Sequence, residues 1–220
     1  FTEYAPAPSL GPLVASLIRH PNIMTEEYLK SLIDKLNKNE SDGLVHIRPL
    51  SATVDFAKVW TEQPKTTDNI VGNEGPYRFY FIKNSEGVYV ATVLDMYRDL
   101  HWFVDIKHRR QGHLTIAMKE TILFHLFQDN REEQRITIDK NQIGGKNHKA
   151  SANVAFSLGF IKSDKNDYIL KNDIYKTENY FYGQNTEITD DRLQELRKRV
   201  NYLAKSLWQI HTEIEMKLGD

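Results

Sequence analysis

The residues with the clearest chemical potential lie in one run, Val104–Thr115 (VDIKHRRQGHLT). An apolar segment ends in a short basic turn with a single glycine, Gly112, and apolar residues at helical spacing follow. A strand that ends in such a turn and opens a helix directs free main-chain N–H groups, and the positive end of the helix, at one point. Arg109 and Arg110 add charge there. The run predicts a phosphate or pyrophosphate site; the simpler interpretation is a strand-to-helix turn with two surface arginines.

A second segment, Asn147–Phe160 (NHKASANVAFSLGF), reads as a short helix that Gly159 ends and a strand follows. Together the two segments resemble the GNAT family of acyl-CoA-dependent N-acyltransferases, which typically reads V-D-P-E-Y-R-G-K-G-x-G/A-T and then N-x-x-S…G-F. The matching residues are Val104, Asp105, Arg109, Gly112, Thr115, Asn147, Ser151, Gly159 and Phe160. Ile106 replaces the usual proline, and Leu114 replaces a small residue, as in the branch similar to ribosomal-protein N-terminal acetyltransferases.

The resemblance covers roughly residues 43–173 and implies an α/β fold, with a GNAT-like mixed central sheet flanked by helices. The sequence pattern predicts the same class. The expected elements are strands 44–50, 78–83, 88–97, 100–106, 135–139, 160–163 and 168–170, and helices 25–38, 112–128 and 149–158, with another helix around Val54–Trp60. Four parts are expected: an N-terminal arm and helix (1–42), the GNAT-like domain (43–173), a linker (174–188) and a C-terminal coiled-coil helix (189–220). A short helix, Leu13–Arg19, is possible in the arm, and residues 61–77 and 140–146 are expected to be irregular.

By resemblance, the co-substrate is acetyl-CoA. Main-chain N–H groups of 111–115 would bind its pyrophosphate, and the edge of 103–106 would pair with its pantetheine arm, since the family separates two central strands there. The expected binding residues are Phe103, Val104, Arg109, Arg110, Gln111, Gly112, His113, Leu114, Thr115 and Asn147.

Two residues are candidates for catalysis. Ser151 lies where the family often places a polar group near the thioester sulfur, although a helix serine with a local bond is an equally good interpretation. The tyrosine that some relatives carry four residues later is Ala155 here. His101 could deprotonate the amine, with Asp105 and Asp95 as alternatives; a structural role for His101, and a water chain as base, stay open.

Composition limits the partners. The chain has 220 residues, 40% of them hydrophobic, and a net charge of −1, which argues against nucleic acid. The absence of cysteine excludes disulfides and thiolate metal sites, and the histidines lack metal-ligand spacing, so no metal is predicted. No apolar run or leader pattern suggests a membrane or secretion. We expect a cytoplasmic protein, or one inside a particle assembled there, and the first residue, Phe1, suggests a fragment or processed product.

The C-terminal segment carries a heptad repeat. Its apolar residues are spaced alternately by three and four: Leu193, Leu196, Val200, Leu203, Leu207, Ile210 and Ile214. Thr189 caps this helix, followed by Asp190 and Asp191. The unbroken 3.5-residue period favours a coiled coil, with homo-oligomerisation through 193–214, over a helix folded back on its own domain.

The favoured function is transfer of an acetyl group from acetyl-CoA to a primary amine, as on a protein N-terminus or a lysine. The alternative is a catalytically degenerate structural or assembly module, such as a component of a viral or other large particle, oligomerised by the coil. A regulatory module that binds CoA without turnover is a third possibility.

Overall fold

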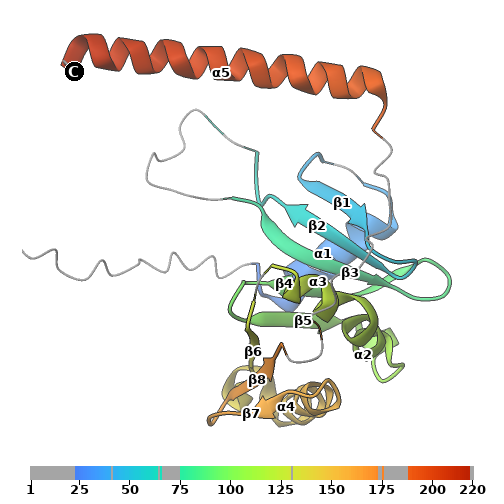
Figure 1. Cartoon of the computed structure of the whole chain (residues 1–220). Helices are drawn as coiled ribbons and strands as arrows, with labels where there is room; N and C mark the ends of the chain where they lie inside the picture. The colour runs from blue at the N-terminus through green and yellow to red at the C-terminus, as the bar shows by residue number, and fades with distance from the viewer. Residues whose placement is uncertain are drawn as a thin grey trace, which may run out of the picture.

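The computed structural model describes residues 23–40, 42–63, 65, 75–129, 131–172, 175 and 188–218. The described part is a mixed α/β protein with two sheets and a long C-terminal helix (Figure 1). The N-terminal arm with the expected helix 13–19, and most of the linker 174–188 and of residues 61–77, lie outside the described residues.

The larger sheet is antiparallel throughout, with its strands in sequence order: β1 (Val45–Pro49), β2 (Val54–Val59), β3 (Tyr77–Lys83), β4 (Tyr89–Asp95) and β5 (Leu100–Val104). The register sets Phe56 opposite Tyr80 and Val93 opposite Trp102. The hairpin expected around residues 84–87 is confirmed as β3–β4.

The smaller sheet has three antiparallel strands in the order β6-β8-β7: β6 (Glu133–Thr137), β7 (Ile161–Lys162) and β8 (Asp167–Lys171). Helix α4 (Lys140–Ser157) connects β6 to β7 and lies beside this sheet (Figure 1).

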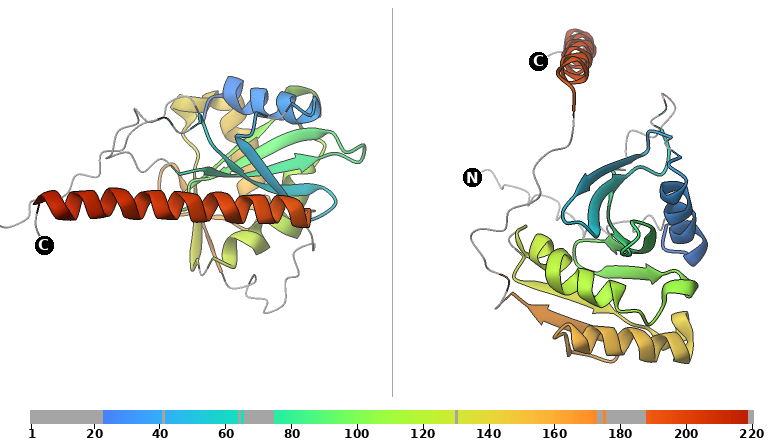
Figure 2. Two further views of the ribbon diagram at one scale, coloured as in Figure 1. Left: turned by 90° about the horizontal axis from the view of Figure 1, so that it is seen from above. Right: turned by 90° about the vertical axis from the view of Figure 1, so that its right-hand side faces the viewer.

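Helices cover both faces of the larger sheet (Figure 2). Helix α1 (Glu26–Asn37) begins at Thr25, whose hydroxyl accepts from the Tyr28 N–H at 3.2 Å. The buried residues of α1 are Leu29, Leu32 and Ile33. They pack on one face of the larger sheet, against Phe79, Phe81, Leu94 and Phe103. Helices α2 (His113–Ala117) and α3 (Leu123–Phe127) cover the other face and are joined by a π-helical turn, η2 (Met118–Ile122). That core contains Tyr80, Ile82, Val93, Met118, Ile122 and Leu126.

Two expectations about secondary structure were wrong. The helix expected at 54–60 is strand β2, whose residues Ala57 and Val59 face the α1 core while Phe56 faces the α3 side. This two-residue alternation fits a strand paired on both sides. The irregular segment expected at 140–146 is the first part of α4, capped by Asp139. Gly144, with φ +73°, interrupts the helical dihedrals within it.

Helix α5 (Asp190–Leu218) follows the Thr189 cap as expected, with the Arg192 N–H donating to Thr189 Oγ1 at 3.2 Å. None of its residues is buried. In the described part of the chain, no helix is long and apolar enough to cross a membrane.

Candidate functional site

A cleft opens where the two sheets meet, between β5 and β6. Among the described residues, a single parallel bridge links Asp99, which directly precedes β5, to Arg135 of β6. Asp99 also holds this junction with its side chain, because its Oδ1 accepts from the Thr137 N–H at 2.9 Å. Beyond the bridge the strands are not paired, so the edge of β5 stays open along the cleft.

The open edge consists of main-chain groups of alternate residues. The Asp105 N–H donates to Val90 O, and the Met96 N–H donates to Asp99 O, so the odd-numbered positions face β4. The alternation of an antiparallel ladder therefore turns the N–H and C=O groups of Trp102 and Val104 toward the cleft. An extended ligand with amide groups could pair with this edge.

The loop after β5 contains a short 3₁₀ turn, η1 (Ile106–His108), and ends at Gly112, the N-cap of α2. Arg110 and Gly112 both adopt positive φ, +66° and +84°. In the described residues, no acceptor bonds the N–H groups of His113, Leu114 and Thr115, and no side chain caps this helix end. Successive free N–H groups of this kind form a concave anion site.

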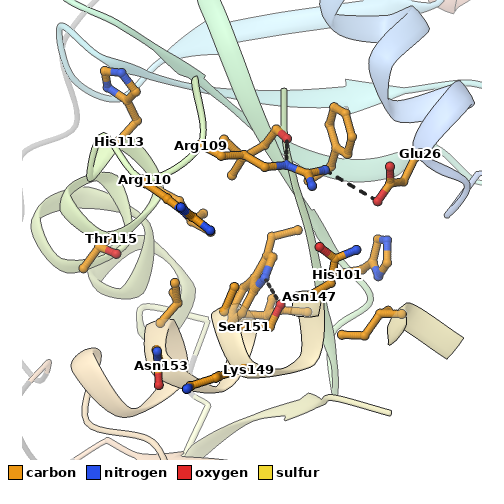
Figure 3. A pocket seen from close by; sticks show the side chains of 18 of the residues that line it. Glu26, His101, Arg109, Arg110, His113, Thr115, Asn147, Lys149, Ser151 and Asn153 are labelled. Atoms are coloured by element: carbon orange, nitrogen blue, oxygen red, sulfur yellow. Dashed lines mark hydrogen bonds and ion pairs between the residues drawn. The ribbon is translucent and has the colours of Figure 1, made fainter. Parts of the chain in front are cut away.

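The cleft has a volume of about 1490 Å³. It is lined by almost every residue that the sequence proposed for the site: His101, Phe103, Val104, Arg109, Arg110, Gly112, His113, Leu114, Thr115, Asn147 and Ser151. The exception is Gln111, whose side chain bonds Lys107 O and the His113 ring instead. Figure 3 shows the loop residues on one side of the cleft and the α4 residues on the other.

Arg109 is held across the upper edge of this cleft. Its Nε donates to Val104 O at 3.0 Å, and its Nη2 lies 3.6 Å from the Glu26 carboxylate (Figure 3). Arg109 therefore uses one carbonyl of the open β5 edge and links that edge to the first turn of α1.

His101 occupies the α1 side of the cleft, as Phe103 does. Burial lowers the pKa of His101 below its usual value, although a bond to the Met24 main chain and the nearby carboxylates of Asp99 and Glu26 raise it. A neutral imidazole ring holds a lone pair on one of its two nitrogens, which is what a base requires.

Ser151 lies on α4 and faces Trp102. The indole Nε1–H donates to Ser151 Oγ at 3.4 Å, a long bond (Figure 3). Since Trp102 only donates, Ser151 keeps its own hydroxyl proton available for an acceptor in the cleft.

The sequence did not identify several residues that line the cleft. Glu26 reaches it from α1, Met24 reaches it from the residues just before α1, and Lys146, Lys149 and Asn153 reach it from α4. Lys149 and Asn153 stand inside the second motif, so they could have been found there. Nothing in the sequence linked α1 to the site. In the described residues, no group of three or more His, Asp or Glu is arranged to hold a metal ion.

No family model matches this chain, and no curated protein or solved structure matches it. Support for a function of this cleft therefore comes from its geometry alone.

Proposed function

We propose that this chain is an N-acetyltransferase that moves an acetyl group from acetyl-CoA to a primary amine on a protein N-terminus or a lysine. The observation that carries the proposal is that one cleft combines an open strand edge with uncapped helix N–H groups at its end. The pantetheine arm of CoA carries amides, and its other end carries phosphates. The two parts of the ligand thus match the two parts of the cleft.

The charges along the cleft support the same orientation. Arg109 and Arg110 line the loop end, and Lys146 and Lys149 line the α4 wall. Cations beside the helix N-terminus favour the phosphates. Glu26 and Asp99 lie toward His101, where they would favour an arriving ammonium group.

Acetyl-CoA supplies an activated acyl group when bound. Neutral His101 would accept a proton from the amine, and the Ser151 hydroxyl would donate one to the departing sulfur. The main-chain N–H groups of 113–115 would hold the phosphates, and the open groups of Trp102 would orient the arm. The GNAT-like arrangement that the sequence motifs imply is part of this proposal. The separation of β5 from β6 supports it.

A transfer assay tests the proposal. Because the chain contains no cysteine, a thiol reagent reports released CoA without background from the protein. We expect CoA release that depends on peptides with a free N-terminus or a lysine, and an acetylated peptide by mass spectrometry. A peptide with both amines blocked is the control. Release that is equal with the blocked peptide would contradict amine acetylation.

A structural module is the second candidate, and one observation favours it: α5 leaves a continuous apolar seam exposed. Under this alternative the chain neither binds acetyl-CoA nor releases CoA, while its assembly through α5 persists.

A further inference from the structure

The apolar seam of α5 is the largest feature that the proposed function does not use. Every apolar seam residue from Val200 to Ile214 is exposed by half or more: Val200 66%, Leu203 61%, Leu207 66%, Ile210 56% and Ile214 51%. The helix has 29 residues and buries none of them against the described part of its own chain. A helix with such a seam is stabilised when another helix covers it.

The seam residues fall on the two core positions of a heptad. Leu193, Val200, Leu207 and Ile214 take position a, and Leu196, Leu203, Ile210 and Lys217 take position d. The flanking charges then follow: Arg192, Arg199 and Glu213 lie at g, and Arg197 and His211 lie at e. These flanks determine which orientation of two copies is compatible.

A parallel pair is unfavourable for this sequence. Each Arg192 would face Arg197 of the partner subunit, and Lys217 would meet Lys217 of the partner subunit inside the seam. Arg199 would face only Ala204 of the partner subunit. No opposite charges would meet across the interface, so the flanks and the seam both oppose this arrangement.

An antiparallel pair resolves both conflicts. When Leu196 lies opposite Ile214 of the partner subunit, Val200 lies opposite the partner's Ile210 and Leu203 opposite the partner's Leu207. Each Arg199 then faces Glu213 of the partner subunit. Each Lys217 then lies opposite Leu193 of the partner subunit instead of a second Lys217, and near Asp190 of the partner subunit. The two helix dipoles are also antiparallel, which is the favourable alignment.

We propose that α5 joins two copies of this chain as an antiparallel coiled coil in the register that sets Leu196 opposite Ile214 of the partner subunit. Glu213 takes part although it holds Lys217 within its own helix at 2.5 Å, because a carboxylate accepts several bonds. With a rise of about 1.5 Å per residue, the two helix N-termini stand roughly 45 Å apart. The two α/β domains thus leave the coil at opposite ends. This inference does not depend on the proposed acetyl transfer.

The first test is the mass of the full chain in solution. Light scattering should give about twice the 25.7 kDa of one chain. Leu203→Asp places a carboxylate at the centre of the seam and should give a monomer with unchanged β-sheet content. Asn201→Asp adds the same charge on the outward face, at position b, and should leave the dimer intact. A monomeric wild-type chain, or a dimer that Leu203→Asp does not weaken, would overturn the proposal.

Disulfide trapping tests the orientation of the two helices. Because the chain has no native cysteine, only the introduced cysteines can form a disulfide. Leu196→Cys and Ile214→Cys chains, mixed in a glutathione buffer, should form the mixed disulfide in preference to either symmetric one. Leu193→Cys alone should remain a thiol, because its partner position is Lys217. A symmetric Leu193→Cys disulfide would show a parallel pair and would overturn the orientation.

Charge reversal tests the same contact without cysteine. Arg199→Glu should raise the dissociation constant roughly five- to tenfold, since it replaces two attractive pairs by two repulsive ones. The double variant Arg199→Glu with Glu213→Arg should restore the affinity. A parallel pair predicts no loss for Arg199→Glu, so an unchanged dissociation constant would contradict the antiparallel register.

Discussion

Arg131 and Arg110 carry the same guanidinium group in two very different regions of the molecule. Arg131 is 3% exposed and donates to both carboxylate oxygens of Asp95, at 2.9 and 2.7 Å, and to Tyr97 O and Gln134 Oε1. Arg110 extends from the loop at the cleft, and no described residue bonds it. Arg131 joins the strands on either side of the sheet junction through Nη1 and Nη2, although its buried Nε has no partner among the described residues, whereas Arg110 is available to a ligand.

The histidines repeat this contrast. His125 is buried and bonded through both ring nitrogens, to Tyr80 Oη at 2.7 Å and to Arg48 Nη2 at 3.2 Å. His101 lines the cleft, and in the described residues only one of its ring nitrogens has a bond, to the main chain of Met24. Low pKa values alone therefore do not separate structural from functional histidines; the number of satisfied nitrogens does. The following variants are ordered from the largest expected effect to the smallest.

Arg131→Ala should destabilise the fold most, because it removes both guanidinium bonds from the buried Asp95 carboxylate and leaves Arg78 Nε, at 3.1 Å, as its remaining arginine contact in the described part of the chain. We expect the free energy of unfolding to fall by about 3–5 kcal/mol, measured by urea denaturation. Arg110→Ala, in the open region, should change it by less than about 0.5 kcal/mol. Equal losses in the two variants would remove the distinction between the regions.

His101→Gln should lower kcat by about a hundredfold or more, as expected for removal of a general base. The burial that lowers its pKa keeps the wild-type ring neutral, so wild-type kcat should rise with pH only below the usual value of 6.5 and level off above it. Steady-state kinetics from pH 5 to 8 checks both points. A variant with wild-type kcat would assign His101 a structural role.

His125 should make stability depend on pH. Its pKa is lowered to about 4, first by burial and then by Arg48 and Arg78. A histidine with a lowered folded pKa stabilises the fold above its unfolded pKa, near 6.5, and this contribution is lost as the pH falls toward 4. We expect a loss of about 2–3 kcal/mol over this range, from the pKa difference. His125→Gln should flatten this part of the profile; an identical slope in both proteins would contradict it.

Arg110→Ala should weaken acetyl-CoA binding by a smaller amount, roughly three- to tenfold, because an exposed cation contributes modestly to phosphate binding. The loss should shrink as salt is raised from 50 to 500 mM, since screening removes the contribution from the wild type as well. Titration calorimetry at both salt concentrations measures it. A loss that does not change with salt would indicate a distortion of the loop.

Local signals in the sequence predicted much of this molecule. Thr25 as a cap, the β3–β4 hairpin and the start of α5 depend on neighbouring residues, and each was confirmed. Strand β2 was missed because its apolar residues fit either period, and only its two neighbouring strands decide the matter. The contribution of Glu26 to the cleft could not be predicted, because packing of α1 on the sheet brings it there.

Calorimetric titration of acetyl-CoA into the wild type, Gly112→Asp and Gly112→Ala tests the central claim most directly. Both substitutions strain the same φ of +84°, and a Cβ there meets only Ile116 Cδ1, at 3.5 Å. They therefore differ mainly in the carboxylate that Asp places at the helix N-terminus. We predict micromolar binding by the wild type, a modest loss in Gly112→Ala and no detectable binding in Gly112→Asp. Equal affinities in the two variants, or no binding by the wild type at millimolar acetyl-CoA, would contradict the assignment of this cleft.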